Sequence, residues 1–139
     1  MNKKEITYIQ LKGGNLTVKT TSDFKMIMKQ EFKDGRFDTT DYLFEEDKDI
    51  RVFVENESIY TLPESVYFFY GTELAHIFHG TVLLAKMGVN SFRSLSNKSI
   101  RIITSRLEVN NDQTFSMGNR NLLGSRKLGT KFGSNNSGQ

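Results

Sequence analysis

The sequence predicts an α+β fold with a small antiparallel or mixed sheet of about five to seven strands, one main amphipathic helix at residues 73–87 and, as one of two alternatives, a short helix at residues 22–33. Three observations predict this class. Short segments that alternate apolar and polar residues are separated by turn residues. Residues 73–87 carry apolar side chains at helical spacing. Eleven Phe and five Tyr supply a core, and without cysteine the fold must hold by packing alone.

The first element is a hairpin over residues 5–20. The diglycine Gly13-Gly14 supplies the positive φ angles that a tight turn between strands requires. The alternation in residues 16–19 indicates a strand with one solvent-facing side.

Residues 22–33 fit two structures. Phe24, Met28 and Phe32 satisfy both a helical and a strand pattern. Ser22-Asp23 can cap a helix, whereas residues 33–36 can equally form a hairpin turn. We favour the helix.

Two strands are expected next, at residues 42–44 and 50–55, and a turn and a return strand at residues 59–62 complete a second hairpin. Pro63, the single proline, closes the return strand because it cannot donate to a ladder.

The main helix is expected at residues 73–87, with Thr72 as its N-cap and Gly88 just after its last turn. Apolar residues fall on one side of this helix and both histidines on the other. Gly80 in its middle costs about 1 kcal/mol relative to alanine.

A last long, isoleucine-rich strand is expected at residues 99–109. Residues 1–117 are then expected to form one folded domain. Residues 118–139 are expected to form a flexible basic tail rich in Gly, Ser and Asn, because their apolar residues are too sparse to bury.

Charge is distributed unevenly along the chain. Residues 1–90 hold 11 Lys and Arg against 14 Asp and Glu, whereas residues 91–139 hold 8 against 2. This asymmetry indicates either a basic segment that reaches for phosphate or two parts of the chain that attract each other.

The first functional hypothesis is a small nucleic-acid-binding accessory or regulatory protein, with DNA or RNA as its partner. It is expected to act in the cytoplasm, because a chain without cysteine fits a reducing compartment best. Charged residues interrupt the most apolar stretch, residues 66–89, and argue against a membrane span. Abundant Lys, Asn and Ile beside one proline is typical of an AT-rich bacterial or mobile-element genome. The expected nucleic-acid-binding residues are Arg93, Lys98, Arg101, Arg106, Arg120, Arg126, Lys127 and Lys131.

The alternative hypothesis is an inhibitor or adaptor that binds another protein. Seven acids crowd residues 34–49, and such a stretch can dock on a basic partner surface.

Other patterns are weaker. Glu73, His76 and His79 could offer ligands to a metal, but a spacing of three residues drifts around a helix, and we interpret both histidines as ordinary surface residues. The aromatic run at residues 67–70 is interpreted mainly as core, although exposed rings on a sheet can stack bases. No motif of a standard enzyme class is present, and we expect no catalytic residues, metal or cofactor.

Overall fold

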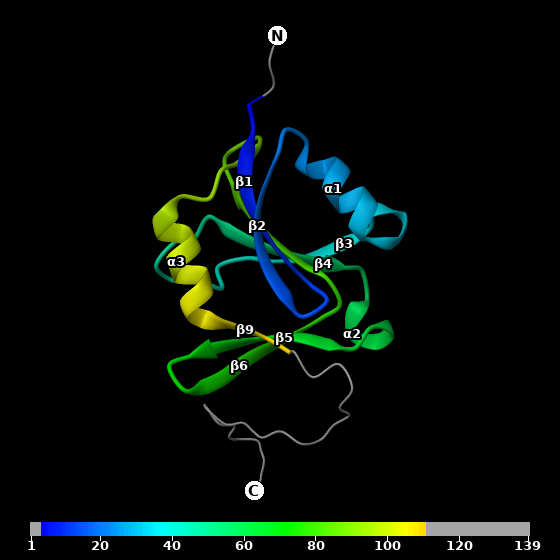
Figure 1. Cartoon of the computed structure of the whole chain (residues 1–139), viewed down its shortest axis with the longest axis vertical. Coiled ribbons are helices and arrows are strands. Elements are labelled where there is room, and N and C mark those ends of the chain that lie inside the picture. The colour runs from blue at the N-terminus through cyan, green and yellow to red at the C-terminus, as the bar shows by residue number, and fades with distance from the viewer. Residues whose placement is uncertain (1–3, 111–139) are drawn as a thin grey trace, which may run out of the picture.

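The computed structural model describes residues 4–110. Within this range nine strands form two antiparallel sheets, accompanied by three α-helices and one 3-10 helix, so the α+β class is confirmed and the expected strand number is too low (Figure 1). The main sheet has the order β2-β1-β7-β4-β3, with β8 paired to β7, and the small sheet has the order β6-β5-β9. The strands of the main sheet are β1 (Ile6–Lys12), β2 (Asn15–Thr21), β3 (Phe37–Thr40), β4 (Ile50–Glu55), β7 (Val82–Met87) and β8 (Phe92–Arg93). The remaining elements are β5 (Glu64–Tyr70), β6 (Glu73–His79), β9 (Leu107–Val109), α1 (Phe24–Glu31), η1 (Lys33–Gly35), α2 (Ser58–Thr61) and α3 (Asn97–Arg106).

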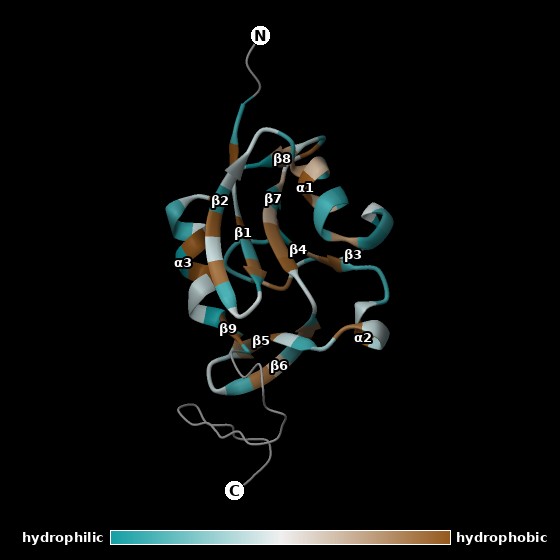
Figure 2. Cartoon of the chain, turned by 45° about the vertical axis from the view of Figure 1, so that its right-hand side comes forward, coloured by the Kyte–Doolittle hydropathy of each residue, from teal (hydrophilic) through white to brown (hydrophobic). Residues whose placement is uncertain are grey.

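The main sheet separates two apolar cores. Successive residues of β7 point to opposite faces: Val82 and Leu84 enter one core, and Leu83 and Ala85 enter the other. The helix α1 covers the second core, whereas α3 and the small sheet cover the first (Figure 1). Figure 2 accordingly shows hydrophobic residues on the central strands and hydrophilic ones on the outer side of α1.

The first hairpin and the helix after it are confirmed. β1 pairs with β2 from Lys12↔Asn15 outward, and Gly13 and Gly14 have φ angles of 60° and 81°. The helical alternative for residues 22–33 is realised as α1, because the Asp23 side chain accepts a hydrogen bond from the Met26 amide at 3.2 Å and caps the first turn.

The second hairpin prediction was partly wrong. Residues 50–55 form β4 as expected, but β4 pairs with β3 and β7, and the expected strand at residues 42–44 is a loop. Residues 59–62 are not a strand, because α2 turns there and the next strand, β5, starts after Pro63.

The prediction of a main helix at residues 73–87 was wrong. This segment is the strands β6 and β7, and the chain turns between them at Gly80, whose φ is 74°. The residues 82–85 are all buried because the main sheet is covered on both faces. A strand that is buried on both faces does not alternate apolar and polar residues. The apolar residues of 73–87 also recur at intervals that fit a helix, so the pattern alone did not identify the strands.

The long strand expected at residues 99–109 was also wrong. Residues 97–106 form α3, and only Leu107–Val109 is a strand. Ser99, Ile103 and Leu107 are spaced four residues apart and are all buried, so packing outweighed the strand preference of the isoleucines. The expected domain boundary at residue 117 and the tail at residues 118–139 lie outside the described residues.

No helix among residues 4–110 is long and apolar enough to cross a membrane.

Candidate nucleic-acid interface

The solvent-facing side of α3 is formed by polar and cationic residues. Exposed positions recur at the spacing of one helical face, and α3 contains no Asp or Glu. Neither cation on this face forms an ion pair within residues 4–110. The exposed residues of this face, which we call the α3 face, are Asn97, Lys98, Arg101, Thr104 and Ser105.

The start of α3 is fixed by its own cap. Ser96 is extended, and its hydroxyl oxygen accepts a hydrogen bond from the Ser99 amide at 3.1 Å. This bond satisfies one of the free N–H groups of the first turn and sets the residue at which the helix begins.

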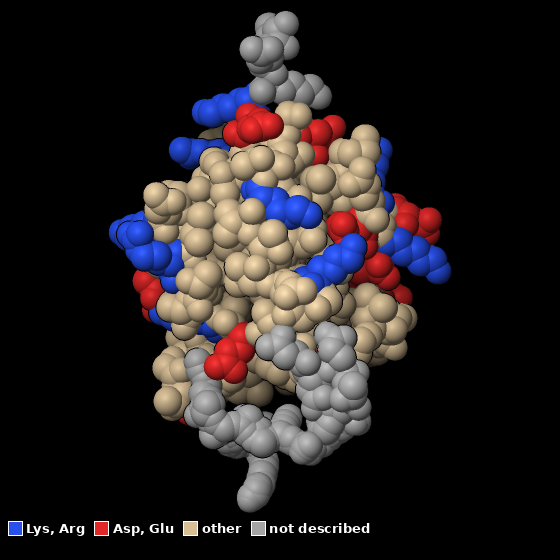
Figure 3. Space-filling view, in the orientation of Figure 1, with Lys and Arg blue, Asp and Glu red and all other residues tan. Residues whose placement is uncertain are grey.

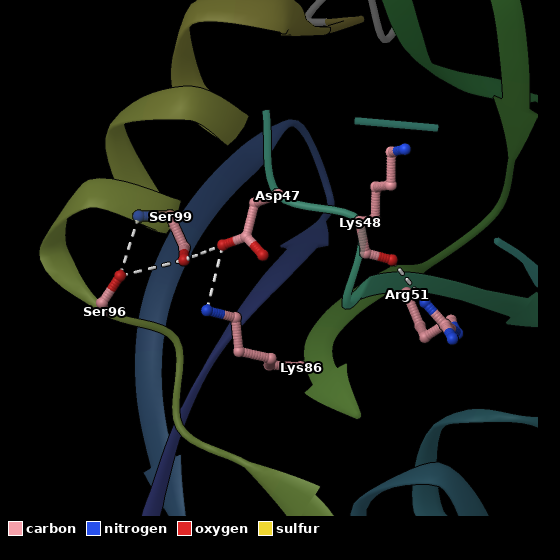
Figure 4. Close-up of polar contacts among 6 residues, drawn as sticks. All are labelled: Asp47, Lys48, Arg51, Lys86, Ser96 and Ser99. Carbon is pink, nitrogen blue, oxygen red and sulfur yellow. Dashed lines mark hydrogen bonds and ion pairs between the residues drawn. The ribbon is translucent and has the colours of Figure 1, made fainter. Parts of the chain in front are cut away.

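A partly buried polar network holds the same turn against the main sheet (Figure 4). The Ser99 hydroxyl donates to the Asp47 carboxylate at 2.5 Å, and the Lys86 ammonium lies 3.0 Å from that carboxylate. Because the Ser99 hydrogen is used on Asp47, the Ser96 hydroxyl donates to the Ser99 oxygen, 2.9 Å away. The loop before β4, the strand β7 and α3 are therefore joined at one carboxylate.

The ionisation of Asp47 reflects this network. Partial burial alone would raise its pKa, but hydrogen bonds from Ser99 and Lys86, with the charge of Lys86, lower the pKa below the ordinary value of 3.8. Asp47 is therefore charged at neutral pH and acts only as an acceptor.

The side chain of Arg106, the last residue of α3, contacts other residues of the same chain. Its guanidinium bonds to the Glu46 carboxylate and lies over the Tyr70 ring, 5.0 Å from the ring centroid. Glu46 and Asp47, which we call the acidic clasp, thus contact α3 at positions two turns apart. Arg106 was predicted as a nucleic-acid contact, and in the structure it anchors the helix.

The structure brings together only part of the predicted basic surface. Lys98 and Arg101 share the α3 face, whereas the exposed Arg93 lies on β8, opposite Lys86 in the ladder. Figure 3 shows Lys and Arg side chains along the left edge, over α3. The remaining predicted residues, Arg120, Arg126, Lys127 and Lys131, lie outside the described residues.

The acidic stretch is partly neutralised within the fold. Asp41 pairs with Arg51 at 3.1 Å, and the two residues of the acidic clasp pair with Lys86 and Arg106. Residues 4–110 carry 14 Lys and Arg against 15 Asp and Glu, a balance of −1. Among residues 4–110, the ion pair that joins the acidic residues 1–90 to the basic residues 91–139 is Glu46–Arg106.

The two histidines lie on β6 and do not form a metal site with Glu73. Among residues 4–110 no three His, Cys, Asp or Glu side chains are grouped to hold a metal ion. The His79 Nδ1 atom lies 2.8 Å from the Leu62 carbonyl oxygen and donates to it. Partial burial, and then the neighbouring His79, lower the pKa of His76.

The aromatic run is mostly core, as interpreted from the sequence. Phe68 and Phe69 are buried, and Tyr70 is 39% exposed at the end of β5. Tyr70 thus places one aromatic ring at the surface beside the C-terminal end of α3.

Comparison of the chain with protein-family models, with curated proteins and with solved structures found no match.

The sequence reasoning missed the acidic clasp and the cap of α3. The spacing Ser96-x-x-Ser99 is a cap signal that could have located the helix. Asp47 lies 52 residues from Ser99 in the sequence, and no local pattern relates the two.

Proposed function

We propose that this chain is a small nucleic-acid-binding protein of accessory or regulatory type, and that the α3 face contacts the phosphate backbone. The observation that carries the proposal is the α3 face itself, where cations and small polar residues occupy every exposed position without one carboxylate. Lys98 and Arg101 supply the charge, because Lys and Arg are the residues that neutralise phosphates.

The other groups on the face can bind parts of a nucleic acid other than its phosphates. The hydroxyls of Thr104 and Ser105 donate to backbone carbonyls of α3, at 3.2 and 2.8 Å, so their oxygens can accept from a ligand. Asn97 offers both a donor and an acceptor. The face is thus compatible with sugar and base edges as well as phosphates.

Further cations extend the proposed contact. Arg93 is exposed near the start of α3 in the sequence, and residues 111–139 carry four Lys and Arg against one Asp. We assign Arg93, Arg120, Arg126, Lys127 and Lys131 to sequence-independent phosphate contacts, and Arg106 to positioning the helix. The cytoplasm is the proposed compartment, because a chain without cysteine does not depend on an oxidising one.

The protein-binding alternative has less support. It requires acids at residues 34–49 that are free to meet a basic partner. Asp41, Glu46 and Asp47 already pair with cations of the same chain. Docking through them would break those pairs.

Fluorescence anisotropy with a labelled oligonucleotide tests the proposal. We expect the double variant Lys98→Gln, Arg101→Gln to bind more weakly and to reduce the slope of log K against log salt by about 1.4 to 1.8, since each lost phosphate contact removes about 0.7 to 0.9. The matched control is Lys25→Gln, Lys29→Gln, which removes the same charge from exposed positions of α1.

Two results would refute the proposal. One is an absence of binding by the wild-type chain at about 50 mM salt, where phosphate contacts are strongest. The other is equal loss of affinity in the α1 and α3 double variants, which would show that only net charge matters.

A further inference from the structure

Two exposed tyrosines each stack with an arginine. Tyr70 lies beside the C-terminal end of α3, and Tyr42 lies in the loop before β4. Tyr42 is 65% exposed, and the Arg51 guanidinium lies 5.2 Å from its ring centroid. Tyr70 is 39% exposed and makes the corresponding contact with Arg106. We call Tyr42 and Tyr70 the tyrosine pair.

Tyr70 contacts the loop that carries Tyr42. The Tyr70 hydroxyl donates to the carbonyl oxygen of Leu43, the residue after Tyr42, at 3.2 Å. Beneath this bond the ring of Tyr70 meets that of Phe68 edge-on at 5.2 Å, and Phe68 meets the buried Phe44 at 5.4 Å. A chain of edge-to-face rings therefore anchors Tyr70 in the core.

The backbone conformation of Tyr42 is unusual for an exposed tyrosine. Its φ angle is +59°, in the left-handed region that bulky residues rarely adopt. A tyrosine held there, with its ring mostly in solvent, contributes little packing to offset this conformation, and such strain gathers at sites of function.

Both arginines beside the tyrosine pair are already used in ion pairs. Arg51 pairs with Asp41, and Arg106 pairs with Glu46. Neither arginine is therefore left as a free cation next to the rings, which suits a flat, neutral nucleobase better than a phosphate. The phosphates would be held by the free cations of the α3 face, Lys98 and Arg101.

We infer that the nucleic acid bound by this chain is single-stranded, with unpaired bases stacked on Tyr42 and Tyr70 while the α3 face holds the phosphate backbone. The inference rests on the proposed function and adds its substrate class. Bases within a duplex are already stacked on each other, so aromatic side chains at a protein surface favour unpaired bases.

Anisotropy with a labelled oligonucleotide of about 16 nucleotides, alone and annealed to its complement, tests the inference. The wild-type chain is expected to bind the single strand more tightly than the duplex. Tyr42→Asn and Tyr70→Leu are each expected to weaken single-strand binding by about 5- to 150-fold, with little change for the duplex.

The variants are chosen to preserve folding. Asparagine tolerates the left-handed backbone at position 42, and leucine keeps apolar bulk at position 70. The matched control is Tyr60→Asn, because Tyr60 is 84% exposed on α2 and is expected to have no effect. Quenching of tyrosine fluorescence by the single strand gives an independent readout in wild type, and Tyr42→Asn should reduce it.

The outcomes separate the two proposals. If duplex and single strand bind equally, and Lys98→Gln, Arg101→Gln weakens both, the proposed function stands and the single-strand inference is wrong. The inference is also wrong if Tyr42→Asn binds the single strand as tightly as Tyr60→Asn does. If neither probe binds, the proposed function fails and the inference fails with it.

Discussion

The two faces of the main sheet are closed by helices of similar length that are held by different interactions. On one face α1 is docked by aromatic packing, with Phe24 in contact with the rings of Tyr8, Phe53 and Phe92 at 4.8 to 5.5 Å. On the other face α3 is docked by Ile103 and also by the acidic clasp. Apolar contacts do not depend on ionisation, whereas charged hydrogen bonds do. We therefore expect pH to affect the docking of α3 more than that of α1, whose ion pair within residues 4–110 joins Glu31 at its end to the exposed Lys12.

The largest expected effect is on the α1 face. Phe24→Ala should lower the free energy of unfolding by about 3 to 5 kcal/mol, because it removes a buried ring and leaves a cavity among three others. Urea denaturation measures this loss. Met26→Ala is the control on the same helix, since Met26 is 47% exposed and should cost far less. A loss below about 1 kcal/mol for Phe24→Ala would mean that aromatic packing does not hold α1.

The second prediction concerns the acidic clasp. Asp47→Ala should cost about 2 to 3 kcal/mol at neutral pH, because Ser99 and Lys86 lose a charged acceptor. Since the folded-state pKa of Asp47 is lowered, its contribution is present above the ordinary value of 3.8 and is lost as pH falls through the lower folded-state pKa.

Denaturation of the Asp47→Ala variant and of wild type over a pH series checks this sign. The difference between them should shrink below pH of about 4, while the cost of Phe24→Ala stays constant. If the loss of unfolding free energy in Asp47→Ala did not change with pH, the account of a pH-dependent docking of α3 would be wrong.

The third prediction concerns the turn that joins the two sheets. Gly80→Ala should destabilise by about 1 to 2 kcal/mol, because φ at this residue is +74° and the new Cβ atom would lie 2.5 Å from Leu62 Cδ1. Gly13→Ala is the control, because Gly13 has a φ of +60° with no atom within 4 Å of the new Cβ. Thermal unfolding should rank Gly80→Ala as the more harmful change. If residues 73–87 were a helix, Gly80→Ala would stabilise the protein.

The smallest effect is expected at the partly exposed Glu46–Arg106 pair. A double-mutant cycle with Glu46→Gln and Arg106→Gln should give a coupling of about 0.5 to 1 kcal/mol that falls as salt is added. A coupling that does not change with salt would argue that Arg106 is held mainly by its contact with Tyr70.

The local signals in the sequence were sufficient for the first part of the fold. The diglycine turn and the Asp23 cap act on neighbouring residues, so β1, β2 and α1 could be predicted. The strands β6 and β7 could not, because burial of Val82–Ala85 on both sides depends on helices and strands elsewhere in the chain.

The candidate site was predictable only as a set of basic residues. Residue type alone selected Lys98 and Arg101, but treating residues 99–109 as a strand placed Arg101 and Arg106 in one extended element. The helix turns these two residues to different sides, and Glu46, which binds Arg106, lies 60 residues earlier. A contact between residues so far apart produces no periodic pattern in a single sequence, so it could not be predicted from the sequence alone.

Chemical-shift mapping by NMR tests the role of the α3 face most directly. A single-stranded oligonucleotide is titrated into the isotope-labelled chain of residues 1–139, and backbone amide shifts are followed. We predict that the largest changes occur at Lys98, Arg101 and Ser105, with changes at Tyr42 and Tyr70 and none at Lys25 or Lys29 of α1. Shifts concentrated on α1, or an unchanged α3 in the presence of bound oligonucleotide, would contradict the account.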